Sequence, residues 1–552
     1  MGAKHAVSLV LNAHFPFVKE YIVPPKKDPQ AEESPPLPSE IFSLNLESAE
    51  ESLFFEAISE TYLPLLEVLD RLEGDRVPFR LGLSVSPILG QMLSDNRLMK
   101  KYAAHLDRQI SFGVRELERL DGAGGQALLA RRYLDQAIDR RAAFATRYEG
   151  SILNALGHYR RKEKIEILAA PATHAFLPFL SQFPESVQAQ VEVGVSFFRH
   201  ALGAPPKGFW LPELGWADGL DRFLRAYGFG FTIADSHGFV FGNPPPSRGG
   251  FFPVKTSQGL LVFCRDHNAV TDLNRMRKEG PYRDNGRDVG HELPSGAIAP
   301  FMARNGARCR TGYKYWQTPQ ADGQPPADVP YDSARACAAA EGHARAFLDN
   351  RRGMLAEAAG LMREQPISVC AFDADVFGRH WHEGPHFLES LFRFAAQSQD
   401  VQFVTPSEYL CWQSFAEFEE STPEFSSWGC NGYAEDLLDS SGDWIYRHIN
   451  RACERMVELA ERFSGDSWVR ERALNQAARE LLLAQSSDWP VMLRRQESSE
   501  FARHRVESAL RNFTTIYDAM SANHISTEWL TDLESQRDVF RDINYRMFRR
   551  KR

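Results

Sequence analysis

The stretch AVSLVL at residues 6–11 is almost entirely apolar, and a polar residue, His14, follows it closely. Six further short runs are mostly of the same kind, without strict alternation of apolar and polar positions: residues 80–85, 165–170, 208–210, 229–234, 261–264 and 367–372. Strands that are buried on both faces have this composition, and helical crossovers join such strands into parallel sheets. The pattern predicts an α/β protein with a parallel sheet or barrel.

The segments between these runs favour helices and a few long loops. Residues 47–72 carry apolar side chains at helical spacing and are interrupted by Pro64, and residues 98–120 form a second helical segment. Three other segments are rich in Pro, Gly or charged residues and are predicted as a flexible excursion, a lid and an insertion over the barrel mouth: residues 24–39, 243–250 and 276–330.

Beyond about Thr405 the chain changes to long amphipathic helices. They are predicted over residues 445–463, 469–484, 506–517 and 529–547. The apolar stripes of these helices must be buried against one another. We therefore expect a barrel domain at residues 1–405, with insertions near residues 24–39 and 236–330, and an α-helical domain at residues 406–552.

The composition limits the classes of partner. The 552 residues are 43% hydrophobic and 25% charged, which is enough apolar material for a large core. The 64 Lys and Arg residues against 73 Asp and Glu give a net charge of −9, so no nucleic acid is expected as the main ligand. No apolar run approaches the length of a membrane span, so no membrane partner is expected. Seven cysteines without a C-x-x-C pair favour reduced thiols in the cytoplasm.

Polar residues follow the predicted strands, at the ends where active sites of parallel α/β barrels lie. They are His14, Ser84, Ser86, His174, Glu213, Asp235, His237, Asp266 and Asp373. A single polar residue after a strand is usually a helix N-cap. Carboxylates and imidazoles from six or seven separate strand ends are harder to explain as caps, so they predict one site.

Glu213 and Asp373 are the leading candidates for chemistry. Each lies in an apolar and aromatic stretch, where loss of hydration raises the pKa of a carboxyl group and can keep one acid of a pair protonated. Such a pair suits the cleavage of a glycosidic bond. The alternative is a cap plus a core salt bridge. The neighbouring Trp210 and Trp381 favour a sugar site, because sugars present apolar C–H faces to aromatic rings.

A cluster of histidines after the last predicted strand raises a second alternative, a metal-dependent deacetylase on a similar barrel. His380, His382 and His386 lie near Asp373 and Asp375 in the sequence. Their spacing matches no strong zinc or iron motif, and histidines on such a loop are more often hydrogen-bonded or solvated. We therefore expect neither a metal nor a cofactor.

Seven motifs occur in order along the chain. Four are in the predicted barrel: LVLNAHFPF at residues 9–17, GLSVSP at 82–87, WLPE at 210–213 and FDADVFG at 372–378. Three are in the helical part: SSWG at residues 426–429, DWIY at 443–446 and LNQAARELLLAQSSDWP at 474–490. In their order and coverage they resemble glycoside hydrolase family 57 and, within it, the 1,4-α-glucan branching enzymes.

The resemblance implies an incomplete (β/α)7 barrel, a helical C-terminal domain that completes a glucan groove, and a retaining mechanism without a metal. By motif position it makes Glu213 the nucleophile and Asp373 the acid/base. It implies contacts with sugar hydroxyls or with the groove for His14, His174, Asp235, His237, Trp381 and Trp428. The expected substrate is an α-glucan polysaccharide, amylose or glycogen-like, whose α-1,4 bond is cut and whose chain is passed to a 6-hydroxyl.

Departures from the family pattern bear on the transfer step. Asn12 stands where branching members have His, Gly249 where they have a loop tyrosine, and Asn274 where they have tryptophan. Arg379 and His380 replace a His-Trp pair. A transferase must protect its covalent intermediate from water until a sugar acceptor arrives, so a lid without tyrosine favours hydrolysis. The alternatives are an α-amylase-like hydrolase of the same family and a catalytically weak glucan-binding protein.

Overall fold

The structure is a computed structural model. It describes residues 5–19, 47–121, 124–203, 206–303, 306–319, 328–463 and 467–550. The predicted excursion at residues 24–39 lies outside the described residues. No helix in the described ranges is long and apolar enough to cross a membrane.

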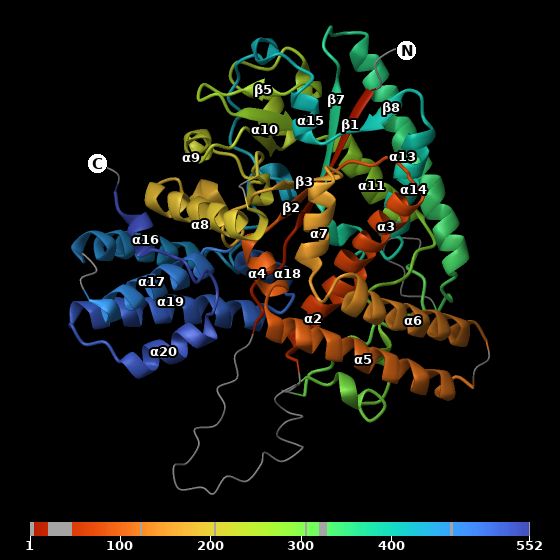
Figure 1. The fold of residues 1–552 in the computed structure, drawn as a ribbon, viewed down its shortest axis with the longest axis horizontal. Helices are drawn as coiled ribbons and strands as arrows, with labels where there is room; N and C mark the ends of the chain where they lie inside the picture. The colour runs from red at the N-terminus through yellow and green to blue at the C-terminus, as the bar shows by residue number, and fades with distance from the viewer. Residues whose placement is uncertain are drawn as a thin grey trace, which may run out of the picture.

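A parallel sheet forms the centre of the molecule (Figure 1). Strand β1 (His5–Ala13) pairs in parallel with β2 (Leu81–Val85) on one side and with β7 (Ile367–Asp373) on the other. Strand β2 continues to β3 (Ile165–Leu168), also in parallel. Every residue of β2, and all of β1 after His5, is buried, so the apolar runs mark strands that are covered on both faces.

Single bridges close this sheet into a ring. Residues 208–209 pair in parallel with Ala169 after β3 and with Phe231 at the start of β4 (Phe231–Ala234). Strand β4 pairs with β6 (Leu261–Cys264), and a bridge from Arg265 to Val369 returns to β7. Seven parallel segments in the described residues therefore follow one another around a barrel in chain order. They coincide with the seven apolar runs, which confirms the predicted (β/α)7 fold class.

Two short strands were not predicted. Strand β5 (Val254–Lys255) is antiparallel to β6, and β8 (Val401–Phe403) pairs with residues 5–7 at the beginning of β1. Both are too short to show a period in the sequence.

The first crossover differs from the prediction at Pro64. Helix α2 (Ala49–Ala57) begins with a capping box between Ser48 and Glu51, continues through a π-helical turn at Ile58–Tyr62, and leads into α3 (Leu63–Gly74). Pro64 falls in the first turn of α3, where a missing N–H costs no helical hydrogen bond. The helical path from α2 to α3 therefore continues without a break at Pro64.

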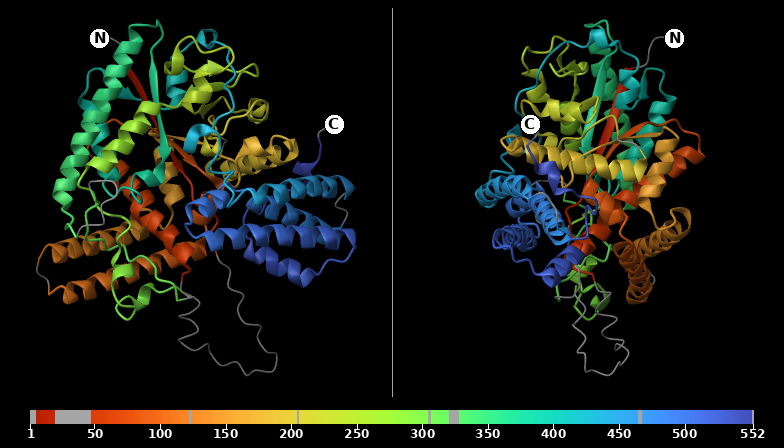
Figure 2. Two further views of the ribbon diagram at one scale, coloured as in Figure 1. Left: turned by 180° about the vertical axis from the view of Figure 1, so that it is seen from behind. Right: turned by 60° about the vertical axis from the view of Figure 1, so that its left-hand side comes forward.

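The remaining helices of the barrel half cover its outside and one end (Figures 1 and 2). They are α4 (Pro87–Leu93), α5 (Asn96–Arg119), α6 (Gly124–Ala142), α7 (Ile152–Arg161), α8 (Pro184–Leu202), α9 (Leu220–Ala226), α10 (Ser236–Val240), α11 (His267–Glu279), α12 (Val289–Glu292), α13 (Ser333–Ala359), α14 (Gly384–Gln397) and α15 (Pro406–Leu410).

The insertion after α11 packs on helices. The Lys314 ammonium lies 2.8 Å from Glu56 of α2, and the Arg283 guanidinium lies 2.7 Å from Glu60 in the π turn. The Tyr313 hydroxyl donates to the Gln109 carbonyl of α5. This segment therefore braces α2 and α5, which differs from the predicted cover over the barrel mouth.

The C-terminal helices form a separate layer beside the barrel (Figure 2). They are α16 (Trp444–Arg462), α17 (Trp468–Ala484), α18 (Asp488–Arg495), α19 (Ser499–Ser521) and α20 (Thr527–Gln536). Three match the predicted stripes. The fourth prediction was wrong in extent, because α20 ends at Gln536 and only a 3-10 turn follows at Tyr545–Phe548. Helix α18 was not predicted as a separate element.

Candidate active site

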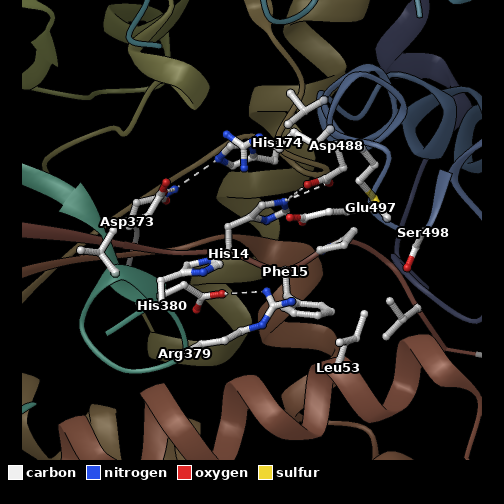
Figure 3. Close-up of a pocket in the computed structure, with 18 of the residues that line it drawn as sticks. His14, Phe15, Leu53, His174, Asp373, Arg379, His380, Asp488, Glu497 and Ser498 are labelled. Atoms are coloured by element: carbon white, nitrogen blue, oxygen red, sulfur yellow. Dashed lines mark hydrogen bonds and ion pairs between the residues drawn. The ribbon is translucent and has the colours of Figure 1, made fainter. Parts of the chain in front are cut away.

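A cavity of about 460 Å³ lies where the C-terminal ends of the barrel strands meet α18 (Figure 3). Its volume is within the range of about 300–1,000 Å³ that small-molecule sites occupy. Its polar lining residues include Asn12, His14, His174, Glu213, Arg277, Asp373, Asp375, Arg379, His380, Asp488, Arg495, Glu497 and Ser498, and its aromatic ones are Phe15 and Trp428. The structure thus brings together Glu213 and Asp373, which are 160 positions apart in the chain.

Glu213 is held from two sides. It lies in a 3-10 turn at Pro212–Leu214 with φ of 55°, a backbone conformation that non-glycine residues adopt at a cost. The Trp428 indole N–H donates to Glu213 Oε2 at 2.5 Å, and the Trp428 backbone N–H donates to the Glu213 carbonyl at 2.7 Å. The Ser487 hydroxyl lies 3.3 Å from Oε1. The barrel and the C-terminal layer therefore fix this carboxyl group together.

Asp373 is positioned by the register of the barrel. It is the last residue of β7, and its Cα partner on β1 is Asn12. The Asn12 side-chain amide donates to Asp373 Oδ1 at 3.0 Å and lies 3.4 Å from His174 Nε2. Asn12 therefore still makes a polar contact with the carboxyl group, although it departs from the residue that the family resemblance led us to expect.

The two carboxyl groups share an electrostatic environment. Burial and the charge of Asp373 raise the pKa of Glu213 from 4.5 to about 7, although the Trp428 hydrogen bond acts in the opposite direction. Burial also raises the pKa of Asp373, while the Asn12 hydrogen bond and the charge of His14 lower it. Loss of hydration therefore raises the pKa of both carboxyl groups, and the charge of Asp373 adds to the rise at Glu213, so the two groups titrate as a coupled pair.

Two stacked imidazoles form the wall beside the acids. The rings of His14 and His174 are 3.9 Å apart and nearly parallel. His14 Nδ1 lies 2.7 Å from the Ser86 hydroxyl, and Nε2 donates to Asp488 at 2.9 Å. Burial and the charge of His14 hold the pKa of His174 well below 6.5, so His174 is neutral. Burial opposes the ionisation of Asp488, but the adjacent His14 lowers the pKa of Asp488 below its usual value.

Sequence reasoning missed Ser487 and Asp488. Both belong to the link between α17 and α18, where Ser486, Ser487 and Asp488 interrupt two apolar helices. The Ser487 hydroxyl donates to the His174 carbonyl at 2.8 Å, and Ser486 donates to Asp488 at 2.5 Å. Three adjacent polar residues between helices whose apolar faces are buried were the signal that could have identified them.

The structure does not bring four of the predicted residues to the cavity. Trp210 is fully buried and packs edge-on against Trp428, and Trp381 is 2% exposed and packs against Tyr282. Neither offers a face to a sugar in this structure. Asp235 accepts from the Arg265 guanidinium at 2.9 Å, and His237 donates to the Gly432 carbonyl at 2.8 Å.

These outer residues nevertheless support the site. The Arg265 guanidinium lies 4.9 Å from the centre of the Trp428 ring and donates to the Ala371 carbonyl of β7 at 3.0 Å. Asp235, by holding Arg265, therefore stabilises the ring that donates to Glu213. Asp235 itself lies outside the set of residues that line the cavity.

The predicted lid and the histidine cluster lie elsewhere than expected. The loop at residues 243–250 packs on residues 417–422, with Ser247 donating to Glu419 and Arg248 paired with Glu364, and it does not line the cavity. His380 lines the cavity, whereas His382 contacts Glu60 on the far side of its loop. The described residues contain no group of three or more His, Cys, Asp or Glu side chains that could hold a metal ion.

Two family models match the chain. The model of glycosyl hydrolase family 57 matches residues 9–277, and the model of the C-terminal part of 1,4-alpha-glucan branching enzymes matches residues 448–548. The 1,4-alpha-glucan branching enzyme TK1436 of Thermococcus kodakarensis is 27% identical over 528 residues, which cover 89% of this chain and 74% of that one.

Solved structures agree with these matches in fold. The alpha-amylase AmyC from Thermotoga maritima superposes with a TM-score of 0.87 at 32% identity, over 100% of both chains. The family 57 branching enzyme from Pyrococcus horikoshii superposes with a TM-score of 0.84 at 22% identity, over 100% of this chain and 98% of that one. The family models match parts of both the barrel and the C-terminal helices, and the solved structures share the whole fold. The chain therefore belongs to glycosyl hydrolase family 57.

Proposed function

We propose that the protein is a retaining α-glucan-active enzyme of the branching type, which cleaves an α-1,4 bond and transfers the released chain to a 6-hydroxyl. The observation that carries this proposal is the pair of carboxyl groups, Glu213 and Asp373, that line one cavity and both have a raised pKa. The matched branching-enzyme C-terminal model and the 27% identity to a branching enzyme support the transferase over other activities on a glucan.

The proposed chemistry needs one ionised and one protonated carboxyl group. Asp373 gives its proton to the leaving glycosidic oxygen while the Glu213 carboxylate bonds to the anomeric carbon, which breaks the C–O bond. Asp373 then takes the proton of an acceptor hydroxyl as that oxygen displaces Glu213. The proposal places the proton of the pair on Asp373 and the negative charge on Glu213 when the sugar is bound, and loss of hydration raises the pKa of both groups.

The wider setting follows from the same proposal. The substrate is a neutral polysaccharide such as amylose or a glycogen-like polymer, acted on in glycogen synthesis in the cytoplasm. The seven cysteines, all of them described, are free thiols, which fits a reducing compartment. We further propose that residues 406–552 act as the domain that completes the glucan groove, since Trp428 and Asp488 both line the cavity.

Linkage analysis tests the transfer step. After incubation with amylose, we expect new α-1,6 branch points, detected by isoamylase debranching and by the anomeric proton signals of the product. The number of new reducing ends should be small compared with the number of new branch points, because the cleaved chain is transferred and not hydrolysed. Products that contain only α-1,4 bonds would exclude the transferase.

A hydrolase of the same family is the second candidate. The loop at residues 243–250, with Gly249, does not line the cavity, so this loop does not shield a glycosyl-enzyme there from water. The similarity to a protein named alpha-amylase, at 32% identity, also favours it. Reducing-end release that greatly exceeds branching would select this activity, and binding without turnover would select a glucan-binding protein.

The indole N–H of Trp428 offers a sharper test of the nucleophile. Trp428→Phe keeps the ring but removes the donor to Glu213, and a hydrogen bond to a charged group is worth about 1.5–3 kcal/mol. We expect kcat to fall about 10- to 100-fold, and the pH–rate profile to move to higher pH because this bond lowers the pKa of Glu213. Trp210→Phe is the matched control, since the Trp210 indole nitrogen has no partner among the described residues. Equal losses in the two variants would argue against the role of the bond.

A further inference from the structure

A second hollow, remote from the active site, has an exposed tryptophan on its wall. Its volume is about 390 Å³, and its lining residues are Pro78, Phe79, Arg80, Ala395, Ala396, Val401, Gln402, Phe403, Val404, Glu408 and Trp412. The Trp412 side chain is 45% exposed, although most tryptophans of this protein are buried or half-buried. None of these residues lines the active-site cavity.

The hollow lies at the opposite end of the barrel from Glu213. Strand β8 pairs with residues 5–7 of β1, whereas β2 pairs with residues 10–13 of the same strand, and the hollow is lined by β8 and by the residues that precede β2. At about 3.3 Å per residue, the distance along β1 from these first residues to His14 is about 25 Å. Figure 1 shows β8 and α15 at the end of the barrel away from α18.

Contacts with Tyr409 position the exposed ring of Trp412. Its backbone N–H donates to the Tyr409 carbonyl at 3.0 Å, and its ring centre lies 6.0 Å from that of the buried Tyr409. Trp412 follows α15 directly, and α15 begins with a capping box in which Glu408 accepts from the Thr405 backbone N–H at 2.9 Å. The ring therefore projects from the turn that follows a short helix with a capped N-terminus.

Polar groups of fixed geometry lie in the same hollow. The other oxygen of Glu408 accepts from the Arg80 guanidinium at 2.5 Å, and Arg80 also donates to the Phe79 carbonyl at 3.1 Å. Both side chains of the pair are about one third exposed, and Gln402 of β8 is half-buried beside them. An aromatic face next to a planar guanidinium, a carboxylate and an amide offers stacking for the C–H face of a pyranose and paired hydrogen bonds for its vicinal hydroxyls.

We propose that this hollow, the Trp412 site, is a secondary site that holds a stretch of α-glucan while another part of the same polymer occupies the active site. The identity of the polymer rests on the proposed function. A nucleic acid does not fit, because Arg80 is already paired with Glu408 and the chain has a net charge of −9. Two sites on one polymer raise the effective concentration of substrate at the active site, so the Trp412 site should matter for long chains and not for short ones.

The test compares two exposed tryptophans. Trp412→Ala removes the platform, and Trp468→Ala is the matched control, since Trp468 is 70% exposed at the start of α17 and its ring faces Arg472 of its own helix. Affinity for amylose is measured by affinity electrophoresis in the Glu213→Gln background, which leaves the polymer uncut. We expect Trp412→Ala to weaken amylose binding about tenfold, or about 1.4 kcal/mol, and Trp468→Ala to leave it as in the parent.

Kinetics separate this inference from the proposed function. In the otherwise native chain, the ratio of KM for amylose to KM for maltoheptaose should rise about fivefold in Trp412→Ala and stay at its native value in Trp468→Ala. If Trp412→Ala converts amylose and keeps the native amylose affinity and the native KM ratio, the proposal of the Trp412 site is wrong, whereas the proposed function stands. Equal weakening in both variants, or a change of oligomeric state in Trp412→Ala alone, would also overturn it. A native chain that neither binds nor converts amylose would overturn both proposals.

Discussion

Glu213→Gln should abolish turnover and at the same time stabilise the fold at alkaline pH. Without the carboxylate no glycosyl-enzyme forms, and we expect kcat to fall about 10⁴-fold or more. The folded-state pKa of Glu213, about 7, is raised above 4.5, so its stabilising contribution is complete below pH 4.5 and is lost as the pH rises through 7. A rise of this size corresponds to about 3 kcal/mol. Thermal unfolding should therefore show the variant more stable than the native chain at pH 8 and equal to it at pH 4.

Glu56→Gln is the matched control for this result. Glu56 is also buried, but Lys314, Arg310 and Arg379 overcome its burial and lower its pKa to about 2. Its contribution is present above pH 4.5 and is lost as the pH falls through 2, so the substitution should destabilise the fold at pH 7 by about 3 kcal/mol. If both variants changed stability in the same direction at pH 8, the electrostatic account of Glu213 would be wrong.

Asp488→Asn should lower kcat/KM by about 100-fold, because truncating one partner of a buried, hydrogen-bonded charge pair costs about 2–5 kcal/mol in favourable cases. The variant removes the charge that accepts from His14 Nε2 at 2.9 Å and leaves the imidazole less firmly oriented beside Asp373. The charge of Asp488 also raises the pKa of Glu213, which must be ionised to act as the nucleophile, so the acid limb of the pH–rate profile should move to lower pH. Initial rates between pH 5 and 9 check both effects.

Asp518→Asn provides the comparison for Asp488→Asn. Asp518 is an exposed acid in α19 of the same helical layer and does not line the cavity. It should keep the native rate and pH profile. A loss of rate in Asp488→Asn without a shift of the acid limb would show that Asp488 acts only by holding the structure together.

Most of the barrel could be predicted from the sequence, and the reason is physical. A strand that is covered on both faces needs a mostly apolar run, and β1, β2 and β7 each have one. Strands β5 and β8 have two and three residues, so they leave no such run. The effect of Pro64 depended on whether it lay inside a helix or in its first turn, which neighbouring residues alone did not decide.

The candidate site was predictable only in part. His14, His174, Glu213 and Asp373 follow barrel strands, and the barrel alone brings strand ends together. Trp381 was placed by its proximity to Asp373 in the sequence, but its side chain is directed into the core instead. Asp488 is 474 positions from its partner His14, and no local pattern reports a contact of that range.

The link between α17 and α18 has a consequence for the synthesis of the protein. Ser487 and Asp488 contact Glu213 and His14 from a part of the chain that follows every barrel strand. A ribosome adds about 5–20 residues per second, and N-terminal parts fold first. Every barrel strand therefore leaves the ribosome well before the last residues of the site exist, and a nascent or prematurely ended chain has no complete catalytic centre. The position of these two residues delays a complete site until the chain has been made through Asp488.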